Sequence, residues 1–150
     1  MELTLPSYTF NIRLQGGRQE VFDPVRKRFI AFTPEESIRQ HWIRYLTEEI
    51  QVPKGRMSVE SGLSYNRLKK RTDLVVHDSF GKPLLLLECK APQVAITESV
   101  FQQAAVYHSR LQVRYMLLSN GNQHVLCKLP DANQPLQFLN RLPSYEMLML

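Results

Sequence analysis

The chain has 150 residues, of which 43% are hydrophobic and 22% charged, with a formal net charge of +5 and two cysteines. This composition excludes a disordered or fibrous protein, and the length predicts one domain over residues 1–150. No apolar run approaches the roughly 18 residues of a membrane-spanning helix, the first residues lack a secretory signal, and two cysteines cannot form a disulfide framework. We therefore expect a cytoplasmic protein that makes no membrane contact.

The first predicted element is an N-terminal β extension within residues 1–32. Apolar side chains alternate over residues 8–32 around "QGG", which predicts a β-hairpin or an edge extension. A helix follows, in which Thr33 is the N-cap, Pro34 the first helical residue and Glu36 the end of a capping box. Its apolar stripe runs to about Ile50, where "QVPKG" ends the helix.

The remaining elements alternate between strands and one helix. Three strands are predicted in "MSVESGLSYN", "RTDLVVHD" and "LLLLECK", with "SFGKP" as the turn before the third. A helix over residues 97–111 precedes two strands, "VRYMLLSNG" and "QHVLCKL". The apolar tail "PSYEMLML" is expected to pack, and a homodimer contact through it is left open. The order predicts an α/β sandwich with a mixed sheet and a core at residues 33–128.

Two carboxylates and a lysine interrupt the apolar strands. Side chains alternate along a strand, so Glu88 and Lys90 share one face. In a simple hairpin centred on Phe80-Gly81, Asp73 lies opposite Glu88, with Cβ atoms roughly 4.5–5.5 Å apart. Two carboxylates there repel each other unless a cation lies between them, and a divalent metal with oxygen ligands would supply it. The backbone carbonyl of Cys89 offers a further ligand, and an ammonium beside a metal-bound water can orient it.

The alternative interpretation is a salt bridge. Glu88 and Lys90 would then form an exposed pair on an edge strand, and Asp73 would only begin the neighbouring strand. The triplet follows a fully apolar run typical of a central strand, which favours the metal site over an isolated ion pair.

At these residues the chain resembles the PD-(D/E)xK nuclease superfamily. Within it, "RTDLVVHDSFGKPLLLLECKAP" is similar to the N-terminal nuclease domain of type I restriction enzyme R subunits, and "FDPVRKRF", "TPEESIRQ" and "SNG" resemble its small stand-alone members. The resemblance covers roughly residues 20–130 and implies a restriction-endonuclease-like αβββαβ core with a mixed sheet flanked by helices. It also implies that Asp73 and Glu88 are metal ligands and that Lys90 is the catalytic lysine. Thr72 stands where the superfamily usually has a proline.

The resemblance implies supporting residues as well. These nucleases commonly use a glutamate of the first helix; Glu36 is explained by the capping box, so Glu35 is the preferred candidate. Glu60 is a further acidic candidate. Gln103 and Tyr107 are four residues apart and are predicted on the apolar stripe of the second helix, where a glutamine needs a hydrogen-bond partner. They match the Q-x-x-x-Y motif of RecB-like and type I restriction nucleases, which lies close to the active site. The alternative for this pair is an ordinary amphipathic helix with a core tyrosine.

These observations predict a Mg²⁺- or Mn²⁺-dependent endonuclease domain that hydrolyses DNA. Two basic clusters are expected to contact phosphates; one is Arg26–Arg28, and the other comprises Arg67, Lys69, Lys70 and Arg71. The sequence has no G-x-x-x-x-G-K-[ST] motif and hence no ATP-driven motor, which suggests separately encoded restriction or motor subunits as partners. Two alternatives remain: a non-catalytic nucleic-acid-binding or interaction module that retains the fold, and a structural domain with an incidental salt bridge.

Overall fold

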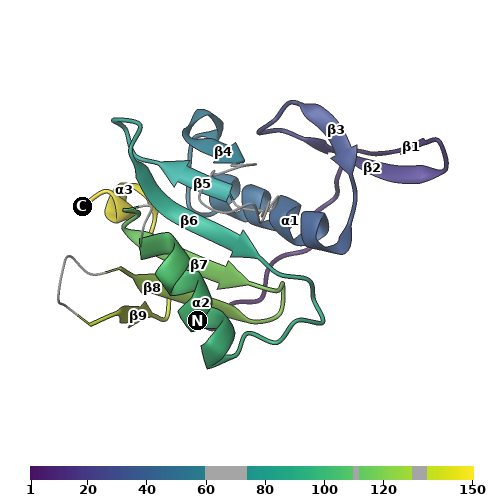
Figure 1. The fold of residues 1–150 in the computed structure, drawn as a ribbon. Coiled ribbons are helices and arrows are strands. Elements are labelled where there is room, and N and C mark those ends of the chain that lie inside the picture. Colours follow the sequence, from purple (N-terminus) through teal and green to yellow (C-terminus); the bar gives the residue numbers. More distant parts are fainter. Residues whose placement is uncertain (60–73, 110–111, 130–134) are drawn as a thin grey trace.

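A computed structural model describes residues 1–59, 74–109, 112–129 and 135–150, except that the side chains of 106–109 are not described (Figure 1). The described elements are, in chain order, β1 (Ile12–Gln15), β2 (Arg18–Asp23), β3 (Arg28–Ala31), α1 (Pro34–Glu48), the 3₁₀ turn η1 (Lys54–Arg56), β4 (Met57–Val59), β5 (Leu74–His77), β6 (Pro83–Cys89), α2 (Glu98–Ser109), β7 (Tyr115–Ser119), β8 (His124–Lys128), β9 (Gln137–Leu139) and α3 (Tyr145–Leu148). No helix in the described part of the chain is both long and apolar enough to cross a membrane.

The body of the protein is a mixed sheet between helices. Its six strands lie in the order β4-β5-β6-β7-β8-β9. β6 and β7 run parallel, and the other neighbouring strands run antiparallel. Because α2 connects β6 to β7, this parallel pair is joined by a helical crossover, as parallel strands require. The succession α1–β4–β5–β6–α2–β7 confirms the expected α/β fold and is compatible with a restriction-endonuclease-like core.

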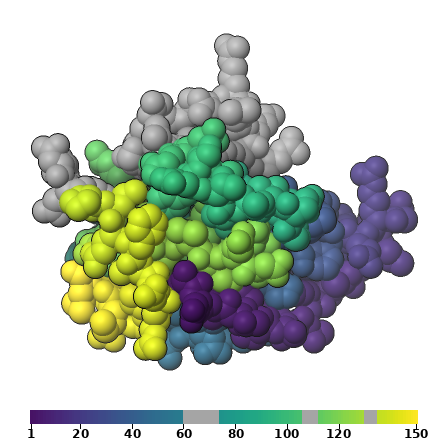
Figure 2. Space-filling model, turned by 90° about the horizontal axis from the view of Figure 1, so that it is seen from below, coloured from purple at the N-terminus to yellow at the C-terminus, as the bar shows by residue number. Residues whose placement is uncertain are grey.

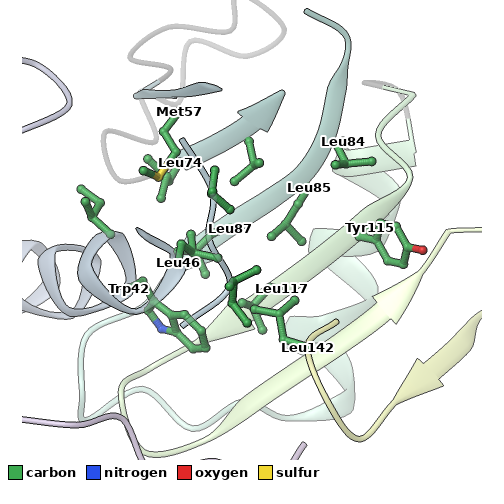
Figure 3. Close-up of a cluster of buried hydrophobic side chains, with 14 of the residues drawn as sticks. Trp42, Leu46, Met57, Leu74, Leu84, Leu85, Leu87, Tyr115, Leu117 and Leu142 are labelled. Atoms are coloured by element: carbon green, nitrogen blue, oxygen red, sulfur yellow. The ribbon is translucent and has the colours of Figure 1, made fainter. Parts of the chain in front are cut away.

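The two long helices cover opposite faces of this sheet. Leu117 packs in the large core cluster with α1, whereas its neighbours Met116 and Leu118 pack with α2. Trp42 of α1 is fully buried in that large cluster, and Figure 3 shows it beside Leu46, Leu87 and Leu117. The sheet is therefore buried on both sides around β6 and β7, which explains why these strands are almost continuously apolar.

Helix α1 begins and ends as its sequence predicts. The Thr33 hydroxyl accepts a hydrogen bond of 3.1 Å from the Glu36 amide, and Pro34 occupies the first turn. At the other end, Gln51 adopts a left-handed φ of 65°, and the Val52 amide donates to the Leu46 carbonyl at 2.9 Å. These contacts satisfy backbone groups that a helix terminus otherwise leaves unpaired.

The N-terminal extension differs from the expected hairpin. It is a three-stranded antiparallel sheet, β1-β2-β3, and strand structure starts only at Ile12. The expected strand residues Tyr8 and Phe10 instead contact the ring of His41 on α1, at centroid distances of 6.0 and 4.8 Å. Gly16 and Gly17 both have positive φ, which makes the tight β1–β2 turn possible.

The two ends of the chain pack on the body. The Met1 amine donates to the His124 carbonyl at 3.1 Å, and Leu3 and Leu5 pack against the large core cluster. Figure 2 shows these first residues, in dark purple, against the yellow C-terminal part. The sequence did not predict β9 or α3. In α3, Tyr145 is buried and its hydroxyl donates to the His77 carbonyl at 2.8 Å, so the apolar tail packs on its own chain.

Candidate active site

The Glu88-x-Lys90 triplet lies at the carboxyl end of the central strand β6. Glu88 is only 2% exposed, although it is a carboxylate. The Lys90 ammonium, which is partly exposed, lies 3.4 Å from Glu88 Oε1. Burial of a charged carboxylate is costly unless a cation compensates it, and the ammonium supplies part of that compensation. The edge-strand alternative does not fit, because β6 lies between β5 and β7.

Strand β7 holds the backbone at this end of β6. The Lys90 amide donates to the Ser119 carbonyl at 2.8 Å, which continues the parallel ladder beyond Cys89. The Asn120 side chain then donates to the Val94 carbonyl at 2.8 Å and ties the loop after Lys90 to the β7–β8 turn. The residues that follow both strands thus meet at one edge of the sheet, where α/β sheets usually place their sites.

The Ser119 hydroxyl joins this edge to helix α1. It accepts hydrogen bonds from Trp42 Nε1 at 2.9 Å and from the Gly121 amide at 3.0 Å. Its own proton can then be donated to His124 Nδ1, 2.8 Å away. His124 Nε2 lies 3.1 Å from the Leu3 carbonyl, so the neutral ring carries its proton on Nε2. Burial lowers the pKa of His124, in keeping with a neutral structural histidine.

The register between β5 and β6 matches the prediction over the described pairs. Leu74 lies opposite Leu87 and Val75 opposite Leu86, as in a hairpin centred on Phe80-Gly81. An irregularity between Val76 and His77 lies next to the turn and leaves those pairs in place. Asp73 lies outside the described residues, so its position opposite Glu88 remains a prediction.

The described part of the predicted donor set suits a hard divalent cation. Glu88 offers a carboxylate, and the Cys89 backbone a carbonyl, the oxygen ligands that Mg²⁺ and Mn²⁺ prefer. Among the described residues, no group of three or more histidine, cysteine, aspartate or glutamate side chains is placed to hold a metal. The predicted site includes Asp73 and therefore extends outside that part of the chain.

A cavity of about 480 Å³ adjoins the end of β6. It lies between the N-terminus of α1, the base of the three-stranded sheet and the loop that follows Lys90; its walls include Arg26, Ile30, Thr33, Glu35, Ala91 and Gln93. The structure thus brings Glu35 to a cavity whose wall also includes the loop after Lys90. Its role at the metal remains a prediction.

The Glu36 carboxylate binds neighbouring side chains instead of closing the predicted capping box. Its carboxylate accepts hydrogen bonds from Arg26 at 2.9 Å, from Arg39, and from Gln40 at 3.4 Å. Only the Thr33 half of the predicted capping box forms, and the interpretation of Glu36 as a cap alone is wrong. Burial raises the pKa of Glu36, and the arginines Arg39 and Arg26 offset only part of that increase.

Asp23 completes a buried ion cluster with Glu36. Its Oδ2 accepts from Arg26 Nε at 2.8 Å and from Arg39 at 3.2 Å, and both Asp23 and Arg39 are fully buried. Burial alone would raise the pKa of Asp23, but the hydrogen bonds from Arg26 and Val25 and the positive charge of Arg39 together outweigh it and hold that pKa below its usual value. We name Asp23, Arg26, Glu36 and Arg39 the ion cluster. This cluster was not predicted, although the spacing of Glu36 and Arg39 is a local signal in the sequence.

The Q-x-x-x-Y pair lies on α2, but Gln103 is exposed. Gln103 was predicted on the apolar stripe, whereas the buried side chains among the described residues of α2 are Phe101, Ala104 and Ala105. That placement is wrong, and Gln103 needs no buried hydrogen-bond partner. The side chain of Tyr107 lies outside the description, so the function of the pair remains a prediction.

The predicted DNA-contacting residues divide into two groups. In the first cluster, Arg26 belongs to the ion cluster, while Lys27 and Arg28 are exposed. The second group lies outside the described residues, as does the acidic candidate Glu60; its members are Arg67, Lys69, Lys70 and Arg71.

Comparison with known families gives one match. Residues 34–143 match the model of a family described as the type I restriction enzyme R protein N terminus (HSDR_N). The match covers more than half of the chain and extends from α1 beyond β9, but it leaves out β1, β2 and β3. No curated protein matches the chain.

Proposed function

Because the chain belongs to the family of type I restriction enzyme R protein N-terminal domains, we propose that it is a metal-dependent endonuclease domain that hydrolyses DNA phosphodiester bonds. The observation that carries this proposal is the buried Glu88 carboxylate with the Lys90 ammonium 3.4 Å away, at the end of the central strand. A structural salt bridge gains little from such burial, because desolvation offsets the attraction between the charges. A buried carboxylate beside a partly exposed lysine is better suited to a reactive site.

In this proposal, Asp73 and Glu88 would hold Mg²⁺ or Mn²⁺ with the Cys89 backbone carbonyl. A bound divalent ion lowers the pKa of a coordinated water and neutralises charge on a phosphate. Lys90 has one end held by the sheet and its ammonium beside Glu88, so it would orient the attacking water or stabilise the charge that develops on the phosphate. Glu35, on the wall of the adjoining cavity, would assist from the first helix.

DNA is the proposed substrate, and other restriction subunits are the proposed partners. The basic side chains of the second cluster, which includes Lys69 and Lys70, would contact phosphates without reading sequence. The 150 residues contain no phosphate-binding motif of an ATPase. Any ATP-driven movement along DNA would therefore come from a motor outside these residues.

The test compares Lys90→Ala with Lys82→Ala on plasmid, linear and branched DNA, with Mg²⁺ or Mn²⁺ and with chelator. Lys82 is an exposed lysine next to the other end of β6, so its variant controls for loss of a positive charge. We expect metal-dependent cleavage that falls by about 10²–10³-fold in Lys90→Ala, the usual effect of removing one electrostatic stabiliser, and that is retained in Lys82→Ala. Cleavage by Lys90→Ala at the wild-type rate would refute the mechanism.

Metal binding separates this proposal from a non-catalytic module with the same fold. Calorimetric titration of Mn²⁺ should show weaker binding in Glu88→Gln and in Asp73→Asn than in the wild type. Glu48→Gln is a suitable control, because Glu48 is an exposed glutamate of α1. Metal binding without cleavage of any DNA would favour the non-catalytic module, and absence of both would favour the incidental salt bridge.

A further inference from the structure

The three-stranded sheet β1-β2-β3 projects from the body of the protein (Figure 1). We name residues Ile12–Ala31 the β arm. The family match begins only at residue 34, so the β arm lies outside the matched residues. In the proposed nuclease, the β arm has no role beyond the phosphate contacts expected near Arg26–Arg28.

The base of the β arm is fixed beside the candidate active site. Val21 and Asp23 of β2 are fully buried, and Asp23 belongs to the ion cluster that connects the arm to α1. Ile30 and Ala31 of β3 line the same cavity as Ala91, which directly follows Lys90. The β arm therefore emerges next to the strand end that carries the catalytic triplet, and its base is held by packed contacts.

The charge of the β arm is positive, and its acidic residues are neutralised. Residues 12–31 contain five arginines or lysines and two acidic residues. One of these acids, Glu20, pairs with Arg13 at 2.8 Å, and the other belongs to the ion cluster. Three basic side chains are exposed and make no ion pair among the described residues: Arg18, Lys27 and Arg28.

The tip of the β arm is narrower than its base. β3 pairs only with residues 20–23 of β2, so beyond that point β1 and β2 form a two-stranded ribbon. All residues of this ribbon's tip, from Leu14 to Gln19, are exposed, and Leu14 is 72% exposed. A Cβ at Gly16 or Gly17 would meet nothing within 4 Å, so the glycines serve the turn and the tip has open space around it.

We propose that the β arm binds duplex DNA beside the cleavage site, with its tip in the major groove and its exposed cations on the phosphates. This proposal rests on the proposed nuclease function for the choice of DNA. The major groove admits a two-stranded β-ribbon, whereas the minor groove is about half as wide. Strand β2, from Arg18 to Asp23, is about 17 Å long, which corresponds to about five base-pair steps of about 3.4 Å each along the axis of the duplex.

A second copy of the chain is the rival occupant of this surface. β1 is an edge strand whose four residues are all exposed, and such edges can pair with another chain. Two β arms with an excess of positive charge would, however, repel each other where they meet, whereas the same charge attracts DNA. The charge therefore favours DNA.

The experiment measures binding of a labelled duplex of about 20 base pairs by fluorescence anisotropy over a range of salt concentrations. All proteins carry Lys90→Ala so that the duplex stays intact. The arm variant adds Arg18→Gln, Lys27→Gln and Arg28→Gln. The control variant adds three neutralisations at exposed residues away from the β arm: Lys54→Gln, Lys82→Gln and Arg141→Gln.

Each phosphate contact contributes about 0.9 to the slope of log K against log salt, so three contacts contribute about 2.7. We expect the arm variant to lose about that much slope, and the control variant to keep the slope of its parent. Equal slopes and affinities for the arm variant and its parent would overturn the proposal. So would an equal loss in the control variant, or a dimer in sedimentation experiments that Leu14→Ser dissociates.

The outcome is separable from that of the nuclease proposal. Binding that depends on the β arm, without cleavage by the protein with native Lys90, would refute only the nuclease. Cleavage that depends on Lys90, together with DNA binding that is unchanged in the arm variant, would refute only the proposal that the β arm binds DNA.

Discussion

Replacing Asp23 with asparagine tests whether the ion cluster stabilises the fold. In the native protein, Asp23 Oδ1 accepts hydrogen bonds from the amides of Val25, at 2.8 Å, and Arg26, at 3.2 Å. An asparagine oxygen can keep those two bonds. Its amino group, however, would face the guanidinium groups of Arg26 and Arg39, and because all of these groups are hydrogen-bond donors, no hydrogen bond can form between them. The substitution also removes a buried negative charge that compensates the two arginines.

The magnitude follows from how deeply each partner is buried. Removing one partner of a buried ion pair typically costs about 3–5 kcal/mol, because the other charge stays buried without compensation. The Arg26 side chain is 22% exposed and can be rehydrated, whereas Arg39 is fully buried and, among the described residues, keeps only Glu36 as an ion-pair partner. We therefore expect Asp23→Asn to lower the free energy of unfolding by about 3 kcal/mol, the lower end of that range. With a urea dependence of about 2 kcal/mol per molar, the midpoint should fall by about 1.5 M.

Glu20→Gln is the matched control. Glu20 lies on the same strand and pairs with Arg13, but the two side chains are 24% and 48% exposed, so its loss should cost less than about 1 kcal/mol. The pH dependence has a definite sign. The pKa of Asp23 is lowered in the folded protein, so its contribution is complete above the unfolded value of about 3.9 and is lost as the pH falls through the folded pKa. Equal midpoints for Asp23→Asn and Glu20→Gln at pH 7 would refute the reasoning.

Two further predictions concern buried titratable groups. The pKa of His124 is lowered by burial in the folded protein. Below about pH 6.5 this histidine therefore binds a proton more readily in the unfolded chain than in the folded protein, and the free energy of unfolding falls. Urea unfolding of His124→Gln should show a smaller loss of stability below pH 6.5 than the wild type, and an unchanged pH dependence would contradict this. Burial raises the pKa of Cys127 to about 11, so at pH 8 only about one molecule in a thousand carries the thiolate. A thiol reagent, followed by peptide mass analysis, should modify Cys127 far more slowly in the native protein than in urea; rapid native labelling would contradict its burial.

Local rules predicted the elements whose ends are set by neighbouring residues. The register of β5 and β6 followed from a turn that fixes both strands, so Leu74 and Leu87 were paired correctly. The start of α1 followed from Thr33 and Pro34, whose effects depend only on the next few residues.

Contacts between distant residues were not predictable in the same way. Arg39 meets Asp23 across 16 positions, and nothing in a local window selects that partner. β9 has three residues and forms through its pairing with β8, in which Leu139 lies opposite Leu126. On α2, small side chains such as Ala104 and Ala105 leave the phase of the apolar stripe ambiguous, so Gln103 was placed on the buried side.

The candidate site was predicted in part for the same reason. Glu88 and Lys90 share a strand, so alternation alone brings their side chains to one face. The cavity beside them depends on the base of the β arm and on the loop at Ala91, which come together only through tertiary packing.

The chain is attached to the body of the protein both before and after the β arm. Leu3 and Leu5 are anchored on the body before the chain enters the arm, and α1 begins directly after it. In topological terms the arm is an insertion with both ends attached, and doubling the length of such a loop costs only about 0.6 kcal/mol. If the arm binds DNA as proposed, added residues at Gly16-Gly17 would extend its reach along the duplex while the sheet that carries Glu88 and Lys90 stays the same. The length of the arm can therefore change without any change in the candidate active site.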